Sequence, residues 1–344
     1  MPEAAVQAKA LLEVENLSKV FDVSKPWLNR VIEGQSRQLL RAVDGISFTI
    51  NRGETLSLVG ESGCGKSTVA RLICGLYAPS SGSITFDGVD LAKMQGTAEM
   101  MKMRRRFQMI FQDPYASLNP RWRVRKIVAE PLLSHGLAKS REEIDRRVGA
   151  LLTDVGLAPQ DGDKYPHEFS GGQRQRISIA RALSSQPEFL VCDEPTSALD
   201  VSVQAQILNL MVDLQREHGL TYLFISHNLA VVSHISTRVG VMYLGRIVEI
   251  AATKTLFARP LHPYTLMLQS AIPDITMSGK ARTPVAGEVP NPLDPPPGCT
   301  FNPRCPYARD KCREVRPELL AFDGAKVACH GIHDGWIPVV QRAA

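Results

Sequence analysis

Gly60-Glu61-Ser62-Gly63-Cys64-Gly65-Lys66-Ser67 fits the spacing G-x-x-x-x-G-K-S/T without a gap. An apolar run at 56–59 leads into this stretch and predicts a buried strand. A helical pattern at 68–74 follows and stops at Gly75, a residue type favoured just after a helix. The order strand, glycine loop, helix separates a phosphate-binding loop from a glycine-rich turn that happens to precede Lys-Ser. We therefore predict a phosphate site here.

The residue types of this loop suit phosphate binding. Glycine lets successive backbone N–H groups point inward, and the helix N-terminus adds a partial positive charge. Lys66 is expected to reach the β- and γ-phosphates, and the Ser67 hydroxyl is expected to ligate Mg²⁺. The predicted nucleotide contacts of this segment are Gly60, Ser62, Gly63, Cys64, Gly65, Lys66, Ser67 and Thr68.

Composition limits the possible classes of protein. The chain has 344 residues, of which 44% are hydrophobic and 22% charged, enough for one large globular domain or two ordinary ones. A net charge of +5 is too mild to argue for nucleic acid as a partner. Residues 1–10 show no secretory signal, and no apolar run approaches the roughly 18 residues that span a bilayer. We expect a cytoplasmic protein whose membrane attachment comes through a partner.

The order of patterns along the chain predicts an interrupted α/β fold. Residues 22–37 predict an exposed insertion, and residues 91–166 are helical and basic, as in a separate helical lobe. Ser140 followed by Glu143 is a capping box, and Gly156 ends that helix. The predicted strands are 11–21, 42–50, 83–86, 189–192, 221–225, 239–243 and 246–250.

Two carboxylates follow a buried strand. Asp193 comes directly after the apolar run 189–192, at a strand end where it would lie beside the phosphate loop and order Mg²⁺. Glu194 follows and is the candidate general base that activates a water for attack on the γ-phosphate. A lone Asp-Glu pair is as often a turn, but a phosphate loop in the same chain favours the catalytic interpretation.

A second anion-binding device lies far along the chain. Ser170-Gly171-Gly172-Gln173 precedes a helix, and Ser170 is its candidate N-cap. One nucleotide cannot easily use two such devices from one chain, whereas two copies facing head to tail could, so we predict a dimer. His227 ends a strand where it could reach the γ-phosphate, although a lone histidine is more often structural. Gln112, where the helical lobe begins, could equally be a turn residue.

Together these residues resemble the ATPase subunit of an ABC transporter over about residues 11–250. The stretch 60–67 matches the Walker A motif of that family, 189–194 its Walker B, and 170–173 its signature. Gln112 matches the Q-loop, 197–200 the D-loop and His227 the H-switch. Two departures are Phe169, where the signature usually begins with Leu, and the 22–37 insertion, which leaves the adenine-stacking aromatic open between Phe21 and Trp27.

The resemblance implies an architecture and a set of roles. The fold would be α/β, a P-loop NTPase (RecA-like) core with an antiparallel β subdomain and an inserted helical subdomain at about 96–170. An ABC ATPase domain at 1–255 would precede a Cys/Pro-rich C-terminal extension at 256–344. Glu194, Gln112 and His227 would be catalytic, and Ser67, Gln112 and Asp193 would hold Mg²⁺. Further nucleotide contacts would be Phe21, Asp200 and, from the other chain of the dimer, Ser170, Gly171, Gly172 and Gln173.

A narrower resemblance is to the oligopeptide/dipeptide branch of importers, carried by residues 111–120, 262–265 and 290–330. It implies an ATP-hydrolysing subunit at the cytoplasmic face of the membrane, paired with an identical or paralogous ATPase. Two permeases and an extracytoplasmic peptide-binding protein would complete the importer. Nickel or another small solute is the alternative cargo. A soluble ABC ATPase would need coiled coils or fused cassettes, and a small-molecule kinase would lack the 170–173 motif.

The end of the chain combines prolines and cysteines. Six prolines fall between Pro284 and Pro297, which indicates a linker or an extended wrapper. Four of the seven cysteines follow, separated by five, six and sixteen residues; they are Cys299, Cys305, Cys312 and Cys329. Four thiolates suit Zn²⁺ or an iron–sulfur cluster, and the wide spacings and the resemblance favour a 4Fe–4S cluster. The plainer alternative is four reduced thiols packed as small apolar groups.

Overall fold

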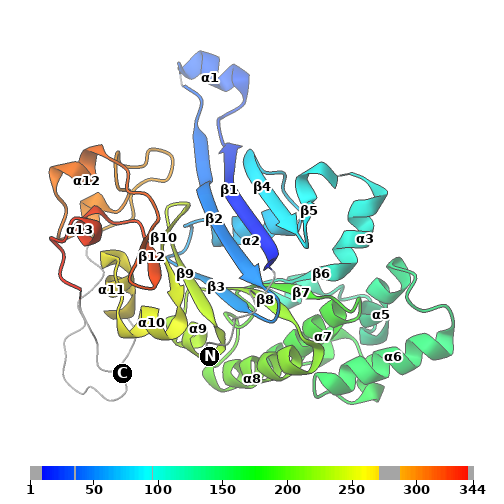
Figure 1. Cartoon of the computed structure of the whole chain (residues 1–344). Helices are drawn as coiled ribbons and strands as arrows, with labels where there is room; N and C mark the ends of the chain where they lie inside the picture. Colours follow the sequence, from blue (N-terminus) through cyan, green and yellow to red (C-terminus); the bar gives the residue numbers. More distant parts are fainter. Residues whose placement is uncertain (1–9, 35, 95, 271–286, 340–344) are drawn as a thin grey trace.

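Two β-sheets and a lobe of helices make up the protein (Figure 1). The computed structural model describes residues 10–34, 36–94, 96–270 and 287–339. Pro284, the first proline of the predicted linker, lies outside these residues. Among the described residues, no helix is both long and apolar enough to cross a bilayer.

The larger sheet has eight strands in the order β11-β12-β10-β9-β3-β8-β7-β6. Every residue of β3, β7 and β8 is buried, which explains why the sequence shows continuous apolar runs there. The strands from β9 to β6 in this order are parallel, so the residues that follow them meet at one edge. The bounds are β3 Thr55–Val59, β6 Phe107–Ile110, β7 Phe189–Asp193, β8 Thr221–Ser226, β9 Arg238–Tyr243, β10 Arg246–Ala252, β11 Leu320–Phe322 and β12 Ala325–Val327.

The smaller sheet is antiparallel and has the order β2-β1-β4-β5. Its strands are β1 Ala10–Asp22, β2 Leu39–Asn51, β4 Ser81–Phe86 and β5 Val89–Asp90. The predicted strands at 11–21, 42–50 and 83–86 are confirmed, each longer by one to a few residues. The predicted insertion carries a short helix, α1 (Trp27–Glu33), which projects from the far end of β1 and β2 (Figure 1).

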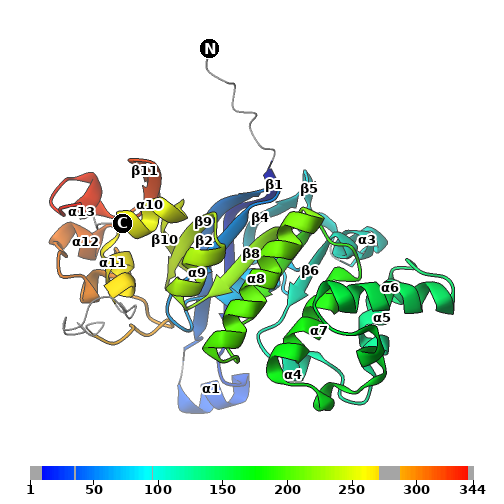
Figure 2. The same ribbon diagram turned by 90° about the horizontal axis from the view of Figure 1, so that it is seen from below.

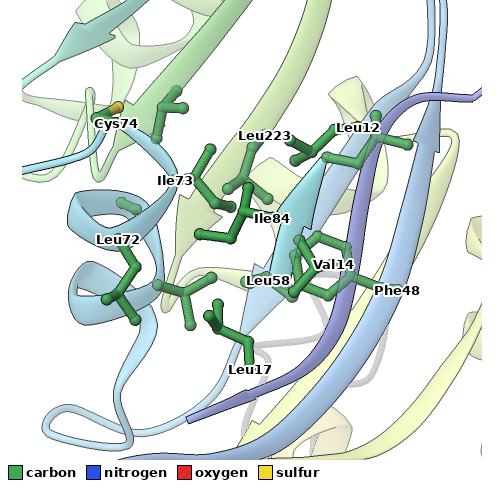
Figure 3. Packing of buried hydrophobic residues seen from close by; sticks show 14 of the residues in the cluster. Leu12, Val14, Leu17, Phe48, Leu58, Leu72, Ile73, Cys74, Ile84 and Leu223 are labelled. Carbon is green, nitrogen blue, oxygen red and sulfur yellow. The ribbon is translucent and has the colours of Figure 1, made fainter. Parts of the chain in front are cut away.

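Helix α2 (Lys66–Ile73) lies between the two sheets. Leu72 and Ile73 pack in one apolar cluster with Leu12 and Phe48 of the antiparallel sheet and Leu58 of β3 (Figure 3). All of these side chains are at most 5% exposed. The phosphate loop that precedes α2 is therefore fixed at both of its ends by the same core.

Helices fill much of the region predicted as a helical lobe, and those that pack together start at Pro114, later than the predicted segment. Its helices are α4 Pro114–Ser117, α5 Val124–Ser134, α6 Arg141–Asp154 and α7 Gly171–Leu183, with α3 Ala98–Arg106 ahead of them and the 3₁₀ turns η1 Leu91–Met94, η2 Pro159–Asp163 and η3 Pro166–Glu168. The capping box is half confirmed: Ser140 accepts from the Glu143 N–H, whereas the Glu143 carboxylate accepts from the Lys139 N–H. The prediction of one helical segment from 91 to 166 was wrong at β6, which pairs with β7 at the sheet edge. Its four residues are too short an apolar run to be told from helix by pattern alone.

Helices α8 (Val201–His218) and α9 (Leu229–Ile235) lie on the face of the large sheet opposite α2, as Figure 2 shows from below. The chain then continues through α10 Thr253–Ala258, α11 Pro263–Ser270, η4 Asn302–Arg304, α12 Asp310–Glu314 and α13 His330–His333. We call residues 256–344 the tail.

The tail continues the fold of residues 10–255. Strand β12 pairs antiparallel with β10, and β11 pairs with β12, so the tail contributes two of the eight strands of the larger sheet. Tyr264, Phe301 and Val327 of the tail share an apolar cluster with Val239 and Tyr243. The two parts predicted from the sequence therefore have one sheet and one core in common.

Candidate active site

The phosphate loop turns sharply between β3 and α2. Gly60 and Gly65 have φ angles of +155° and +106°, which side chains other than glycine rarely adopt. A Cβ at Gly60 would lie 2.1 Å from the Met242 carbonyl oxygen, and one at Gly65 would lie 2.1 Å from that of Ala42. Two of the three motif glycines are thus required by close backbone contact as well as by backbone conformation.

Lys66 is folded back over this loop. Its side chain is buried, and Nζ donates to the carbonyl oxygens of Gly60 at 2.8 Å and Glu61 at 2.9 Å. Cys64 packs into the core, with Sγ 3.6 Å from the same Nζ, and burial raises the pKa of its thiol. A contact of Cys64 with a nucleotide would therefore have to come from its backbone.

Ser67 meets Asp193 where β3 and β7 reach the same edge of the sheet. The Ser67 hydroxyl donates to Asp193 Oδ1 at 2.8 Å. Asp193 is 3% exposed, and burial raises the pKa of its carboxyl, an effect that the Ser67 hydrogen bond opposes. A hydroxyl and a carboxylate side by side are oxygen ligands of the kind Mg²⁺ takes, so these two residues fit the predicted ion.

Glu194 is the centre of a second group of side chains. Its Oε2 accepts from Gln112 Nε2 at 3.3 Å and lies 3.1 Å from His227 Nδ1. Glu194 has a φ angle of +47°, and its backbone N–H donates to the Ile225 carbonyl of β8. The left-handed backbone turns its side chain away from the strand direction, toward Gln112 and His227, which the sequence places 82 and 33 residues away.

A cavity of 870 Å³ joins these two groups. It is lined by predicted site residues, which are Phe21, Ser62, Gly63, Gly65, Lys66, Ser67, Thr68, Gln112, Glu194 and His227. Phe21 borders the cavity, with its ring 5.4 Å edge-on from that of Tyr77, whereas Trp27 is 67% exposed on α1 and is not part of the lining.

The motif 170–173 lies elsewhere. Ser170 caps α7 by accepting from the Gln173 N–H at 3.4 Å, and Gln173 Oε1 accepts from the Ser170 N–H at 3.0 Å. Asp200 caps α8 through the Val203 N–H at 3.0 Å. A Cβ at Gly171 or Gly172 would meet Leu199 or Val203 on α8 or just before it. The residues 170–173 and Asp200 are not among those that line the 870 Å³ cavity.

Sequence reasoning missed one wall of the cavity. The tail contributes Pro292, Pro295, Pro296, Pro297, Gly298, Thr300 and Arg316 to the lining. Arg316 Nη2 lies 3.3 Å from Asp44 Oδ2, and Arg246 donates to the same oxygen at 2.8 Å. The proline run was the available signal, because a stiff segment without backbone donors suits a wall, but nothing in it indicates which cavity it borders.

The four tail cysteines come near one another without forming a metal site. Burial, with a smaller contribution from neighbouring thiols of the group, raises the pKa of Cys299 to about 12 and that of Cys305 to about 11. Within the residues that the structure describes, no group of three or more His, Cys, Asp or Glu side chains is arranged to hold a metal. The predicted 4Fe–4S or zinc centre has no support in this geometry.

Comparisons with known proteins agree with the geometry. The chain matches the family described as ABC transporter over residues 43–197, and the oligopeptide/dipeptide transporter C-terminal region over residues 248–312. It is 48% identical to the oligopeptide transport ATP-binding protein AppF of Bacillus subtilis, over 95% of this chain and 98% of that protein. It is 46% identical to the dipeptide transport ATP-binding protein DppF of Escherichia coli, over 96% of each.

A similar cassette has been solved as a dimer. The chain superposes on the ATP-binding cassette MJ0796, solved as a dimer in a post-hydrolysis state with ADP and Pi, with a TM-score of 0.61. That match has 26% sequence identity and covers 70% of this chain and 98% of the cassette. With near-complete alignment to its relatives, the chain belongs to the ABC transporter family of ATP-binding proteins, in the group that carries the oligopeptide/dipeptide transporter C-terminal region.

Proposed function

We propose that this chain is the ATP-hydrolysing subunit that powers import of di- and oligopeptides through a membrane transporter. The observation that carries this proposal is that Lys66, Ser67, Glu194 and His227 line one cavity, with Asp193 bonded to Ser67 beside it. The cargo follows from relatives named for oligopeptide and dipeptide transport, which align with the tail as well as with the cassette. Nickel or another small solute remains the alternative cargo.

The phosphate loop would bind the nucleotide by exchanging its internal contacts. The Lys66 ammonium, which now bonds two loop carbonyls, would turn to the β- and γ-phosphates of ATP. Ser67 and Asp193, together with Gln112, would hold a Mg²⁺ ion that neutralises charge on the phosphates. Phe21, at the cavity border, is our choice for stacking on the adenine.

Glu194 would act as the general base. Its carboxylate would orient a water for in-line attack on the γ-phosphate and accept a proton from it. Gln112 and His227 both contact the same Oε2, so they hold this oxygen in place from two sides. His227 is exposed on the cavity side and would contact the γ-phosphate.

A second ATPase subunit would complete the site. The motif 170–173 lies outside the cavity of its own chain, yet Ser170 and Gln173 at the start of α7 are exposed. A head-to-tail partner, identical or paralogous, would bring its Ser170, Gly172 and Gln173 to the nucleotide. The similar cassette that was solved as a dimer supports this arrangement.

The permeases would dock beside Gln112. A groove of 290 Å³ separates the core from the helical lobe, and exposed Leu76 and Phe111 border it. Tyr115, on α4 just beyond Gln112, is 59% exposed. An apolar seat next to the Q-loop would let closure of the ATPase dimer move a permease helix at the cytoplasmic face of the membrane. An extracytoplasmic binding protein would deliver the peptide to the permeases.

The test is uptake by cells with and without the gene. Deletion should abolish accumulation of labelled di- and oligopeptides and leave nickel accumulation unchanged, and the wild-type gene should restore peptide uptake. Loss of nickel uptake with normal peptide uptake would replace peptide by nickel as the cargo. Normal uptake of both would contradict an importer role.

For the four cysteines we retain the 4Fe–4S cluster, with zinc as the alternative, as a proposal about the tail alone. Its basis is the sequence alone, four cysteines in a proline-rich segment, because the described residues form no group arranged to hold a metal. Anaerobic purification followed by iron and zinc analysis and visible absorption decides between the two. Absence of both metals, with four thiols that titrate on unfolding, would leave the cysteines as packing groups.

A further inference from the structure

Arg304 of the tail contacts the phosphate loop directly. It ends the 3₁₀ turn η4, and its side chain is 2% exposed. The guanidinium donates from Nη1 to Glu61 Oε2 at 2.7 Å and from Nη2 to Glu61 Oε1 at 3.0 Å. Glu61 is the second residue of the loop, 243 positions away in the sequence. A bidentate, charge-assisted ion pair of this kind fixes the relative orientation of the two side chains as well as the distance between them.

Glu61 is held at three points. Its carboxylate is held by Arg304, and its backbone N–H donates to the Tyr264 hydroxyl at 2.9 Å. Its carbonyl accepts from Lys66 Nζ at 2.9 Å. Two of these three contacts come from the tail, and the third is the lysine that is expected to bind phosphate. The tail thus fixes the residue against which Lys66 is packed.

The groups that make these contacts are themselves immobilised. The rings of Tyr243, Tyr264 and Phe301 pack at centroid distances of 4.7, 5.3 and 5.5 Å, and each ring is at most 1% exposed. The Tyr243 hydroxyl also accepts from Arg304 Nη1 at 3.4 Å. We call these three rings the aromatic bed. Because Arg304 lies against the aromatic bed, its side chain has little freedom to follow a moving loop.

We propose that Arg304 is a positioning residue for ATP binding, which acts through Glu61 and makes the tail a structural part of the nucleotide site. Holding Glu61 sets the path of the loop backbone whose N–H groups face the phosphates. A loop displaced by about 1 Å is enough to cost a binding site of this kind much of its affinity. The proposal rests on ATP binding by this chain.

The test uses the full-length chain and a fluorescent ATP analogue, mant-ATP, with Mg²⁺. Arg304→Gln is expected to weaken mant-ATP binding about tenfold. The mant-ATP affinity of Arg304→Lys should lie between those of wild type and Arg304→Gln, because lysine restores the charge without the bidentate geometry. In steady-state hydrolysis KM for ATP should rise while kcat stays within about twofold, since Glu194 and His227 are untouched.

A matched control removes an arginine pair inside the tail. Arg259 pairs with Asp323 and contacts no residue of the phosphate loop in the described structure, so Arg259→Gln should leave mant-ATP affinity unchanged. Tyr264→Phe keeps the aromatic bed and deletes only the hydroxyl bonded to Glu61. It is expected to weaken binding in the same direction as Arg304→Gln, and it tests the proposal even if Arg304→Gln does not fold.

The double variant Glu61→Gln with Arg304→Gln separates positioning from charge. If Arg304 positions the loop, the double variant binds as weakly as Arg304→Gln alone, because both remove the same pair. Wild-type affinity in the double variant would overturn the proposal, since Arg304 would then only neutralise Glu61. Wild-type affinity in Arg304→Gln and Tyr264→Phe would overturn it as well. Failure of the wild-type chain to bind mant-ATP would instead refute ATP hydrolysis as its function.

Discussion

The two walls of the nucleotide cavity are built in different ways. On one wall, Lys66 and Ser67 follow β3 through the phosphate loop and Glu194 directly follows β7, with Asp193 behind them bonded to Ser67. On the other, Arg316 and the proline run reach the cavity from the tail. The residues of the first wall are positioned by the sheet edge that carries them, whereas those of the second wall are positioned by packing between segments that are distant in the sequence.

The two walls also differ in what their side chains contact. Ser67 bonds Asp193, and Gln112 bonds Glu194, so the first wall is a network of hydrogen-bonded groups at the proposed phosphate site. Arg304 bonds the outer side of the phosphate loop, and Arg316 contacts Asp44 at the cavity rim. This difference predicts that changes in the first wall affect turnover, whereas changes in the tail affect affinity and stability.

The sharpest test of this division is Glu194→Gln. Glutamine has the shape of glutamate but cannot accept the proton of the attacking water. We expect ATP affinity to stay within about twofold of wild type and the rate of hydrolysis to fall at least about 100-fold. Hydrolysis by the transporter complex and mant-ATP binding by the chain measure the two quantities separately.

The control is Glu217→Gln on the exposed face of α8, which should leave both quantities unchanged. A Glu194→Gln variant that hydrolyses ATP at a near wild-type rate would remove Glu194 as the base. Loss of ATP affinity in that variant would contradict the separation between the two walls, because a first-wall change would then act on binding.

The first wall could be predicted from the sequence. Its residues follow continuous apolar runs, and the order strand, glycine loop, helix needs no knowledge of distant contacts. The sequence also predicted Ser170 as an N-cap, and Ser170 caps α7 in a capping box with Gln173. The choice between Phe21 and Trp27 was beyond the sequence, because it depends on where the 22–37 insertion points relative to the cavity.

The second wall could not be predicted, for a physical reason. The packing that brings the tail to the cavity also pairs Arg304 with Glu61, two ordinary charged residues outside the cavity lining. Their contact depends on β12 pairing with β10 and on the aromatic bed, both of which are non-local. The strand β6 was missed for a related reason: its sheet edge is defined by β7, more than 80 residues later in the chain. Where a residue works through a non-local contact, composition and spacing give no signal.

The stability of the protein at low pH offers a test of the tail, because the tail contains a buried histidine that is neutral in the folded state. His262 is 1% exposed, and burial lowers its pKa from 6.5 to about 3. At pH values between 3 and 6.5, His262 is therefore protonated in the unfolded chain and neutral in the folded chain. The folded state has its full stability with respect to this residue above pH 6.5 and loses stability as the pH falls toward 3. Between about pH 5.5 and 4 the free energy of unfolding should fall by about 1.4 kcal/mol per pH unit from this residue.

His262→Asn isolates that contribution. The asparagine Oδ1 can replace Nδ1 as acceptor for the Tyr264 N–H and cannot titrate in this range. Urea unfolding at several pH values should give a shallower pH dependence for His262→Asn, whereas the exposed His218→Asn should match wild type. Parallel pH profiles for His262→Asn and wild type would show that His262 is accessible to protons in the folded tail.

The smallest expected effect belongs to Arg316, and it decides whether the second wall senses the nucleotide at all. Its side chain is 52% exposed and shares Asp44 with Arg246, so one carboxylate faces two guanidinium groups and positive charge is left over at the cavity rim. Solvent and salt screen such a charge, so Arg316→Gln should weaken mant-ATP binding only about two- to threefold at low salt. The loss should shrink further near 0.5 M salt, and Arg313→Gln, an exposed tail arginine outside the cavity lining, should show no loss. A loss that did not depend on salt would indicate displaced structure instead of charge, and an unchanged affinity would limit the role of the tail to the contacts that it makes with Glu61.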